Sequence, residues 1–265
     1  MLTHLDVDDF RRLLARGVPP PSGFRFPGIE LGAALELASA FLESSDDALL
    51  KLLDAWSRAD ERLAGARAAL RGAVSEPDLF SAPTLEFASL RSRQDLDRLP
   101  SRFCDRFERS LKSHGFGKKL AAGIAKSFFD MADNVVQHSG PDVDHPAIGA
   151  LAYEVADRRC SFAVTDLGRG MLASLRTNPA WEQLSTSAEA LDAAVRNGAS
   201  SRVGQGKGQG FSELHRALAD LVGWLRFASG DAVLRLEGEP DKRIAPRGSR
   251  PPLCGFQITV SIKLN

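Results

Sequence analysis

The sequence predicts a two-layer α+β sandwich that follows a helical N-terminal region. Residues 1–80 show helix-like apolar periodicity and little strand character. Residues 84–265 mix long helix patterns with alternating segments that are typical of strands. Most of these strands are joined by short turns, which favours hairpins in one sheet covered by helices. We therefore expect one sandwich domain with a helical appendage.

The composition excludes several classes of partner. The 265 residues carry equal numbers of basic and acidic side chains, so the zero formal net charge gives no reason to expect a nucleic-acid partner. No apolar run approaches the roughly 20 residues that span a bilayer. The acidic segment Met1–Asp9 lacks the basic and apolar regions of a signal peptide. The three cysteines show neither metal-ligand spacing nor a disulfide framework, so a cytoplasmic protein is expected.

The N-terminal region is expected to hold three helices. They span Asp6–Arg16, Leu31–Leu42 and Asp46–Arg71. The third carries a heptad-like apolar stripe, formed by Leu49, Trp56, Leu63 and Leu70. Two interpretations stay open: a helix packed on its own domain, or a dimerisation helix that makes residues 1–80 a dimer or partner surface.

The remaining elements follow a linker predicted at Ser75–Pro83. Helices are expected at Ser101–Ser113 and Lys118–His138, the second ending at Ser139. A polar loop is expected over residues 238–252, and Thr186–Glu189 resembles a capping box. The predicted strands are Thr84–Leu90, Ile148–Ala156, Cys160–Asp166, Trp224–Ala228, Ala232–Glu237 and Phe256–Leu264.

A first polar motif lies on the helix predicted to end at His138. Asp130, Asn134 and His138 are four residues apart, so they stack along one helix edge, apart from the apolar stripe of that helix. An asparagine oxygen is a neutral ligand for a Mg²⁺ ion already held by phosphates. Asp130 could orient or deprotonate a nucleophile. An ordinary solvated helix edge is the alternative.

A second motif follows the apolar strand that ends at Asp166. A carboxylate at a strand end can accept a hydrogen bond from an exocyclic amino group, such as that of adenine. Gly168 and Gly170 allow the backbone to turn sharply beside a flat ring. A plain Asp-Gly turn is the alternative.

A third motif combines alternating glycines with one lysine and runs into the helix-like segment 211–218. Backbone N–H groups beside a helix N-terminus suit a phosphate, and a lysine could pair with it. The run matches neither a P-loop nor a dinucleotide fingerprint, and a flexible linker is the alternative. The motif residues are Gly204, Gly206, Lys207, Gly208 and Gly210.

In this order and spacing, the three motifs resemble those of the GHKL ATPase superfamily, which includes gyrase B, heat-shock chaperone ATPases, histidine kinases, MutL and anti-sigma-factor serine kinases. The resemblance covers residues 84–264 and implies a Bergerat-type ATP-binding fold. It implies that Asn134 binds Mg²⁺, that His138 belongs to the ATP site and that Asp166 contacts adenine. It also implies that residues 204–210 bind phosphate and that residues 171–203 form the ATP lid.

Two departures from the family pattern affect the expected activity. Asp130 stands where the family usually has Glu, and Leu253 and Cys254 stand where many members have Gly-Thr. The soluble form and compact lid are similar to the free-standing anti-sigma-type kinases. This implies a signalling ATPase or protein kinase that acts on a partner protein. The alternatives are an ATP-gated protein-binding module with little or no catalysis, and a degenerate fold.

Overall fold

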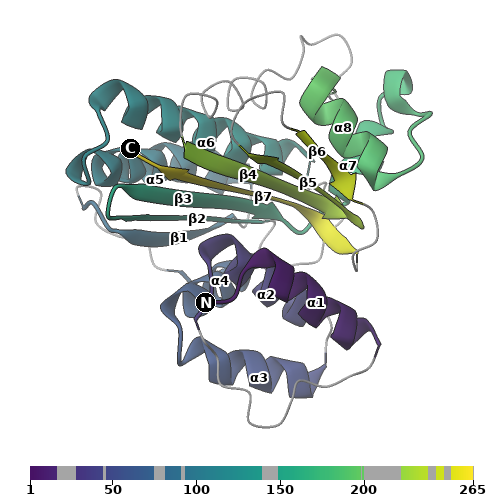
Figure 1. The fold of residues 1–265 in the computed structure, drawn as a ribbon, viewed down its shortest axis with the longest axis horizontal. Helices are drawn as coiled ribbons and strands as arrows, with labels where there is room; N and C mark the ends of the chain where they lie inside the picture. The colour runs from purple at the N-terminus through teal and green to yellow at the C-terminus, as the bar shows by residue number, and fades with distance from the viewer. Residues whose placement is uncertain are drawn as a thin grey trace.

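An antiparallel sheet lies at the centre of the molecule in the computed structural model (Figure 1). The structure describes residues 1–16, 28–43, 46–74, 81–90, 93–138, 149–197, 199, 222–237, 243–247 and 252–264. Within these ranges seven strands pair in the order β1-β2-β3-β7-β4-β5-β6, and every recorded pairing is antiparallel. The predicted α+β class is therefore confirmed. The strands are β1 (Leu85–Leu90), β2 (Gly149–Ala156), β3 (Arg159–Asp166), β4 (Val222–Gly230), β5 (Ala232–Glu237), β6 (Arg243–Arg247) and β7 (Leu253–Lys263).

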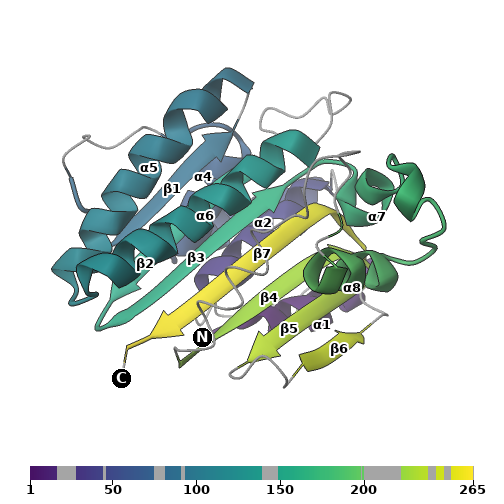
Figure 2. The same cartoon turned by 90° about the horizontal axis from the view of Figure 1, so that it is seen from above.

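One face of the sheet, the aromatic face, is covered by α5 (Arg93–Ser113) and α6 (Lys118–His138), which lie across β1, β2 and β3 (Figure 2). The bounds of α6 agree with the prediction, whereas α5 begins earlier than expected. Large rings from helices and strands interlock between the layers, and the Phe107 and Tyr153 rings stack with centroids 4.6 Å apart. The other rings of this cluster are Phe103, Phe128 and Phe162.

The other face, the N-terminal face, carries the helical N-terminal region (Figure 1). The two layers expected for residues 84–265 are present, and residues 1–74 add a third. Small side chains let the helices approach the sheet closely. Alanines on the strands face the helices, and Gly65 of α4 packs on the Phe87 ring of β1, where an added Cβ atom would lie 2.2 Å away. The helices are α1 (His4–Ala15), α2 (Leu31–Glu43), α3 (Asp47–Ser57) and α4 (Glu61–Leu70), and the small strand residues are Ala150, Ala152 and Ala163.

The predicted single helix over Asp46–Arg71 is wrong, because the chain breaks between α3 and α4. Asp60 begins α4 as its N-cap and accepts hydrogen bonds from the backbone of Arg62 and Leu63. The heptad-like stripe is buried inside the same chain: Trp56, Leu63 and Leu70 belong to the core between the N-terminal helices and the sheet. Of the two interpretations of the stripe, the structure supports packing on its own domain.

The segment predicted as the lid holds helices, as expected from its lack of strand character. The capping box is confirmed, since Glu189 and Thr186 exchange hydrogen bonds at 3.1 and 3.2 Å. These helices pack on the aromatic face beside β4 and β5. They are α7 (Gly170–Leu175), the 3₁₀ turn η1 (Pro179–Trp181) and α8 (Ser187–Asn197).

The prediction of an unbroken loop over residues 238–252 is wrong in part, because Arg243–Arg247 form edge strand β6. This strand pairs with β5, and the pairing is irregular between Val233 and Arg235. Pro246 lies within it, which is compatible with an edge strand because only one side needs N–H donors. None of the helices in the described ranges has the length and apolarity needed to cross a bilayer.

A buried ion network joins the N-terminal layer to the sheet. Glu36 of α2, fully buried, accepts hydrogen bonds from His4 at 3.0 Å, from Arg11 at 3.2 Å and from Arg226 of β4 at 2.8 Å. Arg226 also lies 3.5 Å from Asp8. Because unpaired buried charges are costly, this network fixes how α1 and α2 sit on the sheet.

Candidate functional site

Asp166 ends strand β3 on the aromatic face, and its side chain is almost wholly buried, with 1% exposure. The N–H of Gly168 donates to its Oδ1 at 2.7 Å, and the N–H of Phe256 also donates to the carboxyl group. Burial raises the pKa of this carboxyl to about 7, although the two N–H donors and the charge of Arg169 lower it in part. The group is thus oriented by the backbone and titrates near neutral pH.

Two glycines with positive φ lie close to the turn after β3, and one of them, Gly255, packs on the Asp166 carboxylate. Gly170 has φ +76° and begins α7, and Gly255 has φ +68° and lies within β7. A Cβ atom at Gly255 would lie 2.2 Å from Asp166 Oδ1, so only glycine fits there. The hydroxyl of Ser229 accepts from the Met171 N–H at 2.9 Å and donates to the Gly255 carbonyl at 2.9 Å. These two hydrogen bonds connect the turn after β3 to strands β4 and β7.

The sequence analysis missed Gly255 and Ser229. A signal for Gly255 was present: one glycine inside an alternating strand pattern often marks a bulge or a close backbone approach. The β4–β7 register does shift between Ser229 and Gly230, opposite this glycine. Leu253 is buried and Cys254 exposed at the two positions that depart from the family pattern.

The first polar motif lies on α6, and the structure describes only part of it. Ile124, Phe128 and Met131 are buried in the core, which confirms the apolar stripe as far as the described side chains reach. Asp130 is partly exposed and forms an ion pair with Lys126 at 3.1 Å. Asn134 and His138 belong to α6, but their side chains lie outside what the structure describes. The recorded contacts do not join Asp130 to Asp166.

The glycine motif lies outside the described residues. It comprises Gly204, Gly206, Lys207, Gly208 and Gly210. The described part of the predicted lid ends at Asn197, with Ala199 beyond it, and Trp181 and Leu184 pack against the core. The described residues hold no cluster of three or more His, Cys, Asp or Glu side chains suited to a metal ion. A metal there would need ligands such as Asn134, together with groups of a bound molecule.

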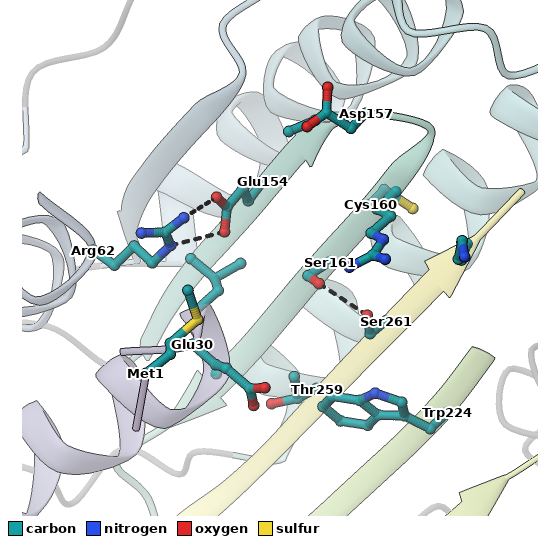
Figure 3. Close-up of a pocket in the computed structure, with 15 residues that line it drawn as sticks. Met1, Glu30, Arg62, Glu154, Asp157, Cys160, Ser161, Trp224, Thr259 and Ser261 are labelled. Atoms are coloured by element: carbon teal, nitrogen blue, oxygen red, sulfur yellow. Dashed lines mark hydrogen bonds and ion pairs between the residues drawn. The ribbon is translucent and has the colours of Figure 1, made fainter. Parts of the chain in front are cut away.

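A cavity of about 720 Å³ lies on the N-terminal face, not beside Asp166 (Figure 3). Its wall includes Arg62 of α4, Glu154 of β2, Ser161 of β3, Trp224 of β4 and Ser261 of β7. No sequence motif marked it, because its residues come from separate segments that only the sheet brings together.

In comparisons with known proteins, no family model matches this chain and no curated protein matches it significantly. Chemical assignments for the chain therefore depend on its own residues and their geometry.

Proposed function

We propose that the chain is a Mg-ATP-binding signalling or regulatory protein with a Bergerat-type sandwich. The observation that carries the proposal is Asp166, a buried carboxylate at a strand end. It is oriented by Gly168 and enclosed by a glycine of the neighbouring strand. A buried, backbone-oriented acceptor suits recognition of an exocyclic amino group, because an unmatched polar group there discriminates strongly against ligands without that donor.

The other residues have roles that follow from the resemblance and from their places in the chain. Asn134 of α6 would coordinate Mg²⁺, with His138 one turn further along the same helix. Lys207 and the N–H groups of the glycine motif would pair with phosphate oxygens. Bound Mg²⁺ would neutralise phosphate charge.

The activity is an ATPase or a protein kinase reaction on a partner protein, with Asp130 orienting the attacking hydroxyl. One observation favours the second candidate, an ATP-gated protein-binding module with little or no catalysis. The Asp130 carboxylate is one methylene shorter than the usual Glu and is paired with Lys126. This pairing occupies the carboxylate that would have to orient the attacking hydroxyl.

Calorimetric titration with ATP and Mg²⁺ tests the binding proposal. We expect Asp166→Asn to weaken ATP binding at least tenfold, because the amide presents a donor where the ligand needs an acceptor. The matched control is Asp231→Asn in the exposed β4–β5 turn, which should bind like the unaltered chain. Equal affinity in all three proteins would reject the adenine assignment.

Measurement of ADP formation separates the two candidates. Turnover that Asp130→Asn abolishes supports catalysis, whereas tight binding without turnover supports the gated module. Asn134→Ala should remove the Mg²⁺ dependence of ATP binding, and its exposed neighbour Asp133→Ala should retain it. A Mg²⁺ dependence that survives Asn134→Ala would show that the metal has other ligands.

A further inference from the structure

The cavity on the N-terminal face forms where the N-terminal helices leave part of the sheet uncovered. The N-terminus of α2 and one side of α4 form its edge, and β2, β3, β7 and β4 form its floor (Figure 3). Its volume of about 720 Å³ falls within the roughly 300–1,000 Å³ of small-molecule sites. Arg159 opens β3 on this face and Asp166 closes it on the other. The cavity is thus separate from the proposed ATP site.

Two cations stand side by side on the cavity floor. Arg159 of β3 and Lys263 of β7 are direct cross-strand partners, and both side chains line the cavity. Like charges in such a pair destabilise an antiparallel sheet. Neither has a recorded ion-pair partner among the described residues, so an anion between them would relieve their repulsion.

A hydroxyl pair lies one step further along the same strands. Ser161 and Ser261 are also cross-strand partners, and the Ser161 hydroxyl donates to that of Ser261 at 3.1 Å (Figure 3). This leaves the Ser261 proton free for another acceptor. The two cations and this hydroxyl therefore lie near one another on the same face of two neighbouring strands.

The three acidic side chains of the wall lie at separate places, and one of them is already paired. Glu154 is held by Arg62, whose Nε donates to it at 2.9 Å. Asp157 lies in the β2–β3 turn, two residues before Arg159, and Glu30 points toward Thr259 and Trp224 at the other end (Figure 3). Burial raises the pKa of Glu30, although Arg235 opposes this. An amine or hydroxyl on a bound molecule would suit Glu30.

We propose that this cavity binds a small polar molecule through an oxyanion, a carboxylate or a phosphate, held by Arg159, Lys263 and the Ser261 hydroxyl. The Glu30 end then selects ligands that also carry a hydrogen-bond donor. The site does not depend on ATP binding at Asp166, because it uses the other face and the other end of β3.

The indole N–H signal of Trp224 in ¹H–¹⁵N spectra tests the site, with inorganic phosphate and succinate as separate probes at constant ionic strength. The chain has three tryptophans, so Trp224→Phe identifies the signal. We expect a saturable shift with one probe, which also decides between phosphate and carboxylate. The double variant Arg159→Gln/Lys263→Gln should weaken binding at least tenfold. Lys119→Gln, an exposed lysine at the start of α6, should not change it.

Two further variants keep the outcome decisive. Arg159→Lys retains the charge and should bind within a few-fold of the unaltered chain, so a loss confined to the double Gln variant identifies charge rather than folding. Asp166→Asn should leave the Trp224 shift intact. The proposal is overturned if neither probe gives a saturable shift, if the double variant binds as before, or if Asp166→Asn abolishes the shift.

Discussion

The two faces of the sheet are built on opposite packing principles, although the same strands make both. On β3, Phe162 and Val164 enter the aromatic face, and the alternate residues Ser161 and Ala163 enter the N-terminal face. Large rings hold α5 and α6 on the aromatic face. Small residues on the N-terminal face admit α2 and α4 at close range and leave a polar cavity beyond them.

The difference shows how one sheet can carry two kinds of site. A tightly filled aromatic face excludes water, so a carboxylate at its edge, such as Asp166, loses hydration and its pKa rises. The cavity at the end of the helical layer has a mostly polar floor, where polar groups stay partly hydrated. The proposed site on the first face would therefore depend on desolvation, and the proposed site on the second would depend on charge.

The largest expected effect is the loss of the buried ion pair on the aromatic face. Arg106, with no exposure, donates to Glu86 at 2.6 and 3.0 Å, and the Tyr153 hydroxyl donates to Glu86 at 2.7 Å. Arg106→Met should lower the free energy of unfolding by about 3–5 kcal/mol, because it leaves a buried carboxylate without its cation. Denaturant unfolding measures this change. Exposed Arg102→Met on the same helix is the control, and an equal, small effect in both would contradict the water-excluding character assigned to this face.

The second-largest expected effect is on stability, because burying Asp166 has a free-energy cost that depends on pH. A carboxyl whose pKa rises from 3.8 to about 7 on folding binds its proton more tightly in the folded state, so stability falls as pH rises between those values. The difference corresponds to about 4 kcal/mol above pH 7. Asp166→Asn should therefore be stabilised relative to the unaltered chain by an amount that grows from pH 4 to pH 7.

Thermal unfolding at several pH values measures this difference, with Asp231→Asn in the exposed turn as a control that should show no such trend. The same Asp166→Asn variant should bind ATP poorly. A variant that gains stability while losing binding would show that the carboxylate is kept for its chemistry. A stability difference that stays constant over this range would argue that Asp166 is not desolvated.

Local patterns predicted much of this fold. The α6 bounds, the β4–β5 hairpin and the capping box at Thr186 depend on neighbours in sequence, and each was found as predicted. The break at Asp60 was missed because the heptad spacing dominated, although an aspartate before Glu61 is itself a start signal for a helix.

Contacts between distant segments could not be predicted in the same way. Gly255 packs on Asp166 only because β3 and β7 are neighbours in the sheet. For the same reason, Arg159 lies directly opposite Lys263 in the register of these strands. The order of strands in a sheet depends on how whole elements pack, so no short segment of the sequence predicts it. The candidate residues of the ATP site were therefore found as separate motifs, whereas the opposite cavity required the structure.

A smaller effect is expected from the close approach on the N-terminal face. Gly65→Ala in α4 should destabilise the chain by about 1–3 kcal/mol, because the new Cβ would lie 2.2 Å from the Phe87 ring and force the helix or the ring to shift. Gly123→Ala in α6 is the matched control, since nothing lies within 4 Å of its new Cβ. It should gain up to about 1 kcal/mol from helix propensity. Equal signs for the two variants would contradict the close packing assigned to α4.

The smallest effect should come from the ion pair that borders the cavity. Arg62 and Glu154 keep 21% and 24% of their side chains exposed, whereas Arg106 and Glu86 keep almost none. A double-mutant cycle with Arg62→Met and Glu154→Gln should give a coupling of about 0–1 kcal/mol, because water screens a partly exposed pair. Added salt should reduce that coupling further. Chemical denaturation of the four proteins supplies the cycle. If this pair coupled as strongly as the buried one, the N-terminal face would be as dry as the aromatic face, and its cavity would be a poor site for a hydrated anion.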